Sequence, residues 1–153
     1  MALKQSLGYQ APDGSSYVTI SDGAGNLAGA GANGFPPGAT PITASSGNVA
    51  AGTAAATLAA AAGKTTYIVG ATVTGGGATA GSIVNGTIVG TISGTMTFNV
   101  PVATGVTVGN QPIYFDFYPA IPASAVNTAI VVSVPTLGAG NTNSSVIAWG
   151  YQI

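Results

Sequence analysis

The side chains of this chain that could perform acid/base or nucleophilic chemistry are few. They are three Asp (Asp13, Asp22 and Asp116), two Lys (Lys4 and Lys64) and six Tyr, and His, Cys, Arg and Glu do not occur. General acid/base catalysis near neutral pH draws chiefly on His, Glu, Asp, Lys, Tyr and Cys with tuned pKa values, and no Ser-His-Asp or Cys-His arrangement can form without His. We therefore expect a protein that is not an enzyme.

Metal and cofactor chemistry is restricted by the same inventory. Without Cys or His, the chain cannot build thiolate zinc sites, iron–sulfur clusters or most transition-metal sites, which leaves a hard cation such as calcium. Asp13 and Asp22 each precede a Gly, a turn context in which an Asp side chain bonds its own backbone. The segment from Asp22 to Asn26 lacks the acidic density of a calcium loop. We expect no metal and no cofactor.

Charge is scarce along the whole chain of 153 residues. Charged residues make up 3% of it and the formal net charge is −1, whereas ordinary soluble domains contain about 25% charged residues. Either other protein copies cover much of the surface, or Thr, Ser and Asn side chains keep the exposed part soluble. We favour the first alternative and expect the chain to be part of an assembly.

Two classes of partner are not expected. Two Lys and no Arg cannot neutralise several phosphates, so we expect no nucleic-acid partner. No stretch of about 20 residues is continuously apolar, so we expect no membrane partner. Residues 1–6 carry no apolar segment behind Lys4, from which we expect no secretory signal and maturation in the cytoplasm where the chain is made.

An aromatic cluster at residues 114–118 is the first candidate binding surface. Alternation along a strand would place Phe115 and Phe117 inward and Tyr114, Asp116 and Tyr118 outward. The outward triplet could bind a sugar or a partner protein, because Tyr offers a large area with a polar tip. Packing of this face on a neighbouring subunit is the more ordinary alternative.

Aromatic residues at two other places are also candidates. Trp149 is the only Trp, and its ordinary role would be a core anchor, with stacking on a sugar as the sharper alternative. Near the N-terminus, an aromatic residue followed by two prolines would be a stiff, peptide-like anchor. The candidate partner-binding residues are Tyr17, Phe35, Pro36, Pro37, Tyr114 and Tyr118.

Turn signals divide the chain into an extended N-terminal arm, residues 1–44, and a domain, residues 45–153. Within the arm only residues 17–20 look like a strand. Its Gly-Ala-rich run has little side chain to bury and would order only against a partner. A plain flexible leader is the alternative.

A period of two predicts the strands of the domain. A hairpin over residues 84–100 turns near Ser93-Gly94, and the Ala-rich stretch 47–63 fits an irregular strand better than a short helix. Further strands are predicted at residues 67–73, 113–117, 129–134 and 146–153, the last with Ile147, Trp149, Tyr151 and Ile153 on one face. Short strands separated by Pro- and Gly-rich connections indicate an all-β fold, an antiparallel, jelly-roll-like β-sandwich.

Residues 14–27, GSSYVTISDGAGNL, resemble the leader of small virion proteins encoded by tailed bacteriophages. Residues 62–70 and 145–153 are similar to the strand edges of jelly-roll head-decoration and fibre domains. The resemblance covers most of the chain and rests on Gly, Thr and Ala patterns. It implies a homotrimeric jelly roll that binds a capsid lattice or forms part of a fibre, and it offers no catalytic residue.

From these observations we expect a bacteriophage virion structural protein. The first hypothesis is a capsid decoration (cement) protein that contacts the major capsid protein or another virion protein and stabilises the head through multivalent contacts. One arm and one domain suit that role better than a longer fibre does. The alternative is a tail-fibre or receptor-binding module in which Tyr114, Tyr118 or Trp149 stacks on a host glycan. A secreted adhesin is a third reading, which the missing signal peptide disfavours.

Overall fold

The computed structural model describes residues 5–10, 16–20, 35–36 and 38–153. The chain divides into two compact units, Met1–Ala39 and Thr40–Ile153. In the first unit, β1 (Gln5–Gln10) pairs antiparallel with β2 (Ser16–Ile20). β2 confirms the strand predicted at residues 17–20, whereas β1 was not predicted.

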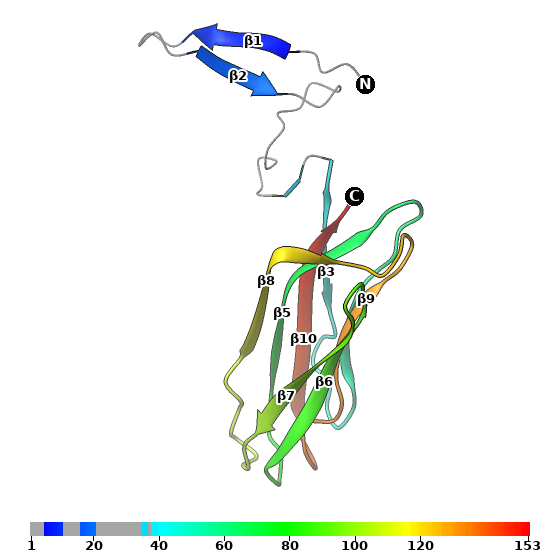
Figure 1. Cartoon of the computed structure of the whole chain (residues 1–153). Coiled ribbons are helices and arrows are strands. Elements are labelled where there is room, and N and C mark those ends of the chain that lie inside the picture. The colour runs from blue at the N-terminus through cyan, green and yellow to red at the C-terminus, as the bar shows by residue number, and fades with distance from the viewer. Residues whose placement is uncertain (1–4, 11–15, 21–34, 37) are drawn as a thin grey trace. The chain divides into compact units, whose positions relative to one another are not determined.

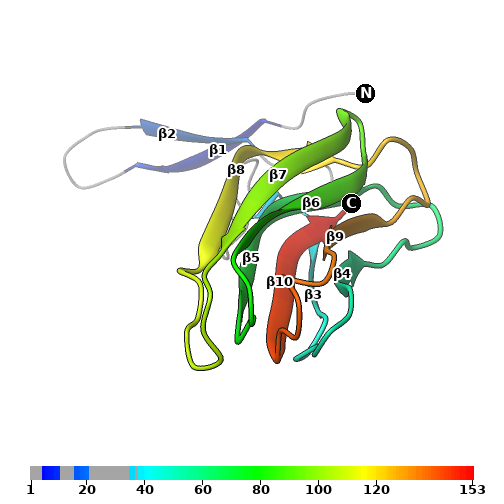
Figure 2. The same cartoon turned by 90° about the horizontal axis from the view of Figure 1, so that it is seen from below.

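The second unit is a sandwich of two antiparallel sheets (Figures 1 and 2). One sheet has the strand order β3-β10-β5-β8 and the other has the order β4-β9-β6-β7. The strands are β3 (Thr40–Ser45), β4 (Ala54–Leu58), β5 (Thr66–Gly76), β6 (Ser82–Thr91), β7 (Gly94–Val102), β8 (Ile113–Pro122), β9 (Ile130–Val134) and β10 (Asn143–Gln152). The predicted all-β antiparallel sandwich is confirmed.

The connections between these strands are those of a jelly roll. Consecutive strands along the chain alternate between the two sheets, except that β6 and β7 form a hairpin within one sheet. Eight strands joined in this way are the jelly-roll arrangement, as the long connections predict. The sheet edges are β3 and β8 in one sheet and β4 and β7 in the other. No helix in the described part of the chain is long and apolar enough to cross a membrane.

The core between the sheets is built from alternating side chains. Ile130, Val132 and Val134 on β9 are completely buried, as predicted, and the inward residues of β4 lie beside them. The paired inward residues are Ile130 with Leu58, Val132 with Ala56, and Val134 with Ala54. Of the Ala-rich stretch 47–63, only residues 54–58 form a strand, and Ala54 and Ala56 supply small side chains to the core.

The hairpin of β6 and β7 turns at residues 92–93, as predicted. The large apolar side chains at its even positions are buried or half-buried except Ile92, which is 66% exposed because it lies in the turn.

The boundary between the units lies earlier than the one predicted after residue 44. β3 pairs along β10 from Thr40 to Ser45, so it belongs to the sandwich. Its composition, with Pro41 and short polar side chains, resembles that of the leader. Only the pairing with a distant strand identifies it as part of the sheet.

Candidate binding site on the outer face of the sandwich

β8 presents the predicted Tyr-Asp-Tyr triplet to solvent. Tyr114 is 71% exposed, Tyr118 is completely exposed and Asp116 is exposed, whereas Phe115 and Phe117 pack against the core. The predicted alternation is confirmed. The inward ring of Phe115 lies 4.6 Å from that of Phe98 on β7, so the two edge strands meet at this side of the sandwich.

Trp149 lies on the outer face of the β3-β10-β5-β8 sheet, which corrects its expected role as a core anchor. The core side of β10 is formed by the completely buried Val146 and Ala148. Trp149 alternates with them, is half-buried and does not belong to the core cluster. Alternation alone identifies the two faces of a strand but not which one faces inward, and here the smaller side chains do.

A glycine on the neighbouring strand makes room for the indole of Trp149. Gly70 on β5 is the pairing partner of Trp149, and a Cβ built on Gly70 would come within 2.5 Å of Cζ2 and 2.7 Å of Cε2 of the indole. On its other side Gly70 pairs with Asp116 of β8. Trp149, Gly70 and Asp116 therefore form one cross-strand row on the outer face, with the indole reaching from β10 toward β8.

A parallel row lies one step along the strands. Ile147 on β10 pairs with Thr72 on β5, which pairs with Tyr114 on β8. Ile147 is 45% exposed and Thr72 is half-buried. The two rows together form a surface that we call the Trp149 face, consisting of Trp149, Gly70, Asp116, Ile147, Thr72 and Tyr114.

A stacked tyrosine pair borders the Trp149 face next to Trp149, on the side opposite to Ile147. The rings of Tyr67 on β5 and Tyr151 on β10 lie 4.8 Å apart and 11° from parallel. Burial raises the pKa of the Tyr151 hydroxyl, and the neighbouring Tyr67 hydroxyl raises it further. This pair fixes the central strands just beyond Trp149.

The charge on this face comes from a single group. Within residues 40–153 the sequence contains only Lys64 and Asp116 as charged residues. The Nζ of Lys64 donates to Oγ1 of Thr40 at 3.0 Å, and no hydrogen bond or ion pair joins the Asp116 carboxylate to another described residue. Asp116 is thus an exposed acceptor beside aromatic and hydroxyl groups.

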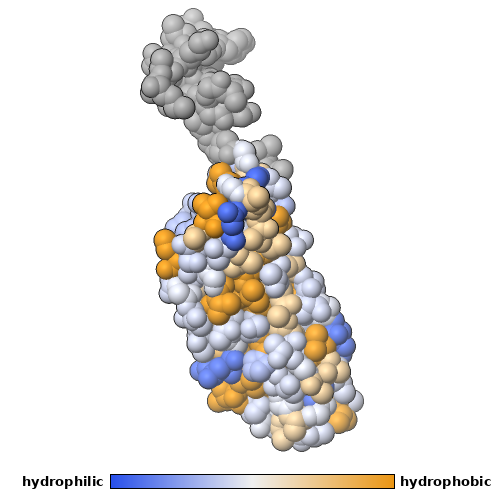
Figure 3. Space-filling view, turned by 90° about the vertical axis from the view of Figure 1, so that its right-hand side faces the viewer, coloured by the Kyte–Doolittle hydropathy of each residue, from blue (hydrophilic) through white to orange (hydrophobic). Residues whose placement is uncertain are grey.

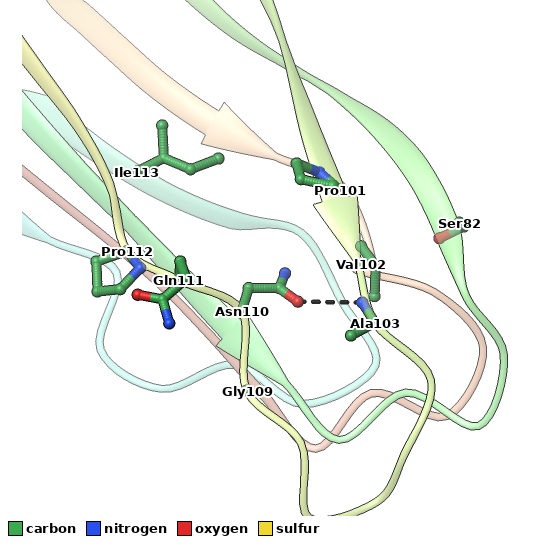
Figure 4. A pocket seen from close by; sticks show the side chains of 9 residues that line it. All are labelled: Ser82, Pro101, Val102, Ala103, Gly109, Asn110, Gln111, Pro112 and Ile113. Carbon is green, nitrogen blue, oxygen red and sulfur yellow. Dashed lines mark hydrogen bonds between the residues drawn. The ribbon is translucent and has the colours of Figure 1, made fainter.

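A second candidate is a hollow of about 460 Å³ between the end of β7 and the start of β8 (Figure 4). Figure 4 shows the Asn110 side chain directed toward Ala103, whose backbone N–H donates to Oδ1 of Asn110 at 3.3 Å. The Nδ2 of Asn110 is buried without a hydrogen-bond partner among the described residues. The hollow is lined by Ser82, Pro101, Val102, Ala103, Gly109, Asn110, Gln111, Pro112 and Ile113.

The candidate residues of the N-terminal unit are described only in part. Phe35 and Pro36 are half-buried, and the Ala39 N–H donates to the Pro36 carbonyl at 3.0 Å. Pro37 lies outside the described residues, as does the side chain of Tyr17, although its backbone belongs to β2. Of the six candidate partner-binding residues, the structure places two, Tyr114 and Tyr118, together on one face of β8.

Three features of these sites were missed by sequence reasoning: the outward position of Trp149, the role of Gly70, and the hollow beside Asn110. A signal existed for Gly70, because a lone Gly inside a strand pattern marks a close approach by another group. No local pattern indicates the other two.

The wider surface of the sandwich is weakly polar. On the face drawn in Figure 3, apolar patches alternate with pale, weakly polar residues, and strongly hydrophilic residues are few. Among the described residues, no three Asp, Glu, His or Cys side chains gather as a metal site would require.

Comparison of the sequence with models of known protein families and with curated proteins finds no match.

Proposed function

We propose that this chain is a structural protein of a tailed-bacteriophage virion, and specifically a homotrimeric capsid decoration protein. It would stabilise the head through many protein–protein contacts with its own copies and with the major capsid protein. The resemblance of residues 14–27 and of the strand edges to phage virion proteins supports the setting. The physical case for an assembling protein comes from the surface of the sandwich.

The observation that carries the proposal is the near absence of charge on a sandwich of 114 residues, Thr40–Ile153, which contains only Lys64 and Asp116 as charged groups. Charged surface groups keep an isolated domain soluble and monomeric. A sandwich with one cation and one anion lacks that protection. Coverage of its surface by other protein copies would remove the need for it.

Exposed apolar side chains lie at both ends of the sandwich, and we call the end that contains Thr40 the Thr40 end. Hydrogen bonds join its segments: Ile92 N–H to the Pro122 carbonyl at 2.9 Å, and Thr65 N–H to the Ile153 carbonyl at 2.8 Å. Lys64 joins Thr40 to the same end. The exposed side chains there are Ile92 (66%), Val126 (51%) and Ile153 (46%). We choose these residues as the candidate contact with neighbouring chains.

The edge strands support the same reading. An unpaired strand edge invites pairing with another chain, and isolated proteins protect such edges with charges, especially Lys. β3, β4 and β7 contain no charged residue, and β8 contains only Asp116. Prolines, which also protect an edge, interrupt three of these strands, at Pro41, Pro101 and Pro119, whereas β4 has neither Pro nor charge. Contacts with a neighbouring chain would cover the β4 edge.

Decoration would work mechanically. Each contact contributes little, but a symmetric trimer on a symmetric lattice repeats it many times, and the linked contacts act together. The N-terminal unit would act as a clasp on a capsid subunit or on a neighbouring copy. No chemical step is needed.

The test is co-sedimentation of the purified chain with undecorated capsids of the phage that encodes it. Val126→Lys places a charge at the Thr40 end, and Val106→Lys, at a position 68% exposed at the other end, is the matched control. We expect saturable binding that Val126→Lys weakens at least tenfold and Val106→Lys leaves unchanged. Absence of saturable binding by the unmodified chain would contradict the proposed function.

A further inference from the structure

We propose that the Trp149 face binds a pyranose sugar, whose ring stacks on the Trp149 indole while its hydroxyls donate to the Asp116 carboxylate. This inference does not rest on a role in the capsid. It rests on the cross-strand row of Trp149, Gly70 and Asp116 and on the hydroxyl groups beside it.

The first requirement of a sugar site is a flat apolar platform. The Cζ2 and Cε2 atoms of the indole lie over Gly70, and Trp149 is half-buried, so part of the ring remains accessible from solvent. A side chain at position 70 would occupy the space that the indole now fills. One side of a pyranose ring is lined by C–H groups, and an aromatic face offers such a surface a large contact area.

The second requirement is a hydrogen-bond acceptor at the rim of the platform. Neighbouring strands lie about 4.8 Å apart, so the Cα atoms of Trp149 and Asp116, two strands apart, are separated by about 10 Å. The indole spans the first half of that distance, over Gly70. A pyranose ring stacked on the indole therefore brings its edge toward the Asp116 carboxylate. A carboxylate accepts only, and its two oxygens can serve two adjacent hydroxyls.

Other groups extend the contact around the platform. Thr72 lies between Ile147 and Tyr114 in the neighbouring row, and Thr43 on β3 pairs with Trp149. Their hydroxyls can donate and accept. Tyr114, which is 71% exposed, adds a second aromatic ring with a polar tip at the β8 side.

The platform stands on rigid elements. β10 and β5 are the two central strands of their sheet, and the stacked rings of Tyr67 and Tyr151 lie next along them. A ligand that binds to such a face orders few side chains, so less of the interaction energy is lost on binding.

An organic cation is the competing ligand for an aromatic face with a carboxylate, and the open geometry disfavours it. Cation recognition by aromatic rings strengthens when the cation is desolvated inside a cage, whereas Asp116 is exposed and the Trp149 face is open. An exposed ion pair contributes little in water. Stacking of a sugar ring depends instead on contact area, which a flat face supplies.

The single Trp makes the test direct, because all indole fluorescence comes from Trp149. The probes are methyl glycosides of glucose, galactose, mannose and N-acetylglucosamine, titrated into the full chain and followed by tryptophan fluorescence and by saturation-transfer NMR. We expect at least one to give a saturable change, with a dissociation constant of about 1–10 mM, as suits one open contact.

Variants locate the site. Asp116→Asn keeps the size of the side chain and is expected to weaken binding at least fivefold, and Trp149→Ala is expected to abolish the NMR signal. Ile83→Ala, on the other sheet at a position 74% exposed, is the control and should bind as the unmodified chain does. Circular dichroism and the urea midpoint verify that each variant is folded.

Two results would overturn the inference. One is the absence of any response in both readouts up to about 100 mM glycoside, far above a millimolar dissociation constant. The other is a saturable response to tetramethylammonium or Nα-acetyl-arginine amide without one to any glycoside, which would make the Trp149 face a cation site. Neither result bears on capsid binding, which the co-sedimentation experiment tests separately.

Discussion

Trp149 on β10 lies over Gly70 of β5, at a point where a Cβ on Gly70 would approach Cζ2 of the indole to 2.5 Å. This relationship keeps the only Trp of the chain on the outer face of the sheet and directs its ring toward Asp116. The largest side chain of the protein is thereby part of its surface.

Replacement of Gly70 by Ala tests this relationship. The new methyl group would meet the indole and also the Phe115 carbonyl oxygen, 2.6 Å away. We expect the free energy of unfolding to fall by about 1–3 kcal/mol, as in overpacked sites, and the fluorescence maximum of Trp149 to shift to longer wavelength. Gly109→Ala is the control, because the nearest atom there is the Gly75 carbonyl oxygen at 3.7 Å. An unchanged Trp149 spectrum in Gly70→Ala would mean that the indole lies elsewhere.

A pair of Asp substitutions tests which strand faces form the core. Ile130 is completely buried and Ile147 is 45% exposed. Ile130→Asp buries an unpaired carboxylate, so we expect loss of the fold or a loss of more than about 4 kcal/mol in the free energy of unfolding. Ile147→Asp should change that free energy by less than about 1 kcal/mol. Urea denaturation followed by circular dichroism measures both, and a stable Ile130→Asp domain would contradict the register.

The sequence predicts the class of fold and most of the strands because alternation is a local signal. The hairpin of β6 and β7 and the inward face of β9 follow from residues within each segment. Two features depend on partners distant in the sequence. β3 is a strand because it pairs with β10, and Trp149 faces outward because Val146 and Ala148 fit the space against the other sheet. A period of two shows which residues share a face of a strand, but it does not show which of the two faces is buried.

Two truncations distinguish the N-terminal unit from the sandwich. A chain that begins at Thr40 retains all eight strands, so we expect a folded β-domain that no longer attaches to capsids. A chain that begins at Ser46 also lacks β3 and leaves one edge of β10 unpaired. It should unfold at a lower urea concentration than the first. Capsid attachment by the chain that begins at Thr40 would show that the N-terminal unit does not act as a clasp. Equal urea midpoints of the two truncated chains would show that β3 is not part of the sheet.

Alkaline pH should destabilise the sandwich through Tyr151. Burial, assisted by Tyr67, raises the pKa of this hydroxyl above its usual value of 10.0. The folded state therefore favours the neutral form, so this contribution to stability is fully present below pH 10 and is lost as the pH rises through the folded-state pKa. We expect the urea midpoint to fall between pH 9 and pH 11 by more in the unmodified chain than in Tyr151→Phe. Equal losses would assign the pH dependence to other groups.

If this sparsely charged sandwich functions as part of an assembly, the purified chain should form an oligomer in solution, and its mass shows whether it does. Light scattering over a range of concentrations should give three times the chain mass of 14.6 kDa, and the same sample should bind undecorated capsids. A mass of one chain at every concentration, without capsid binding, would contradict the account.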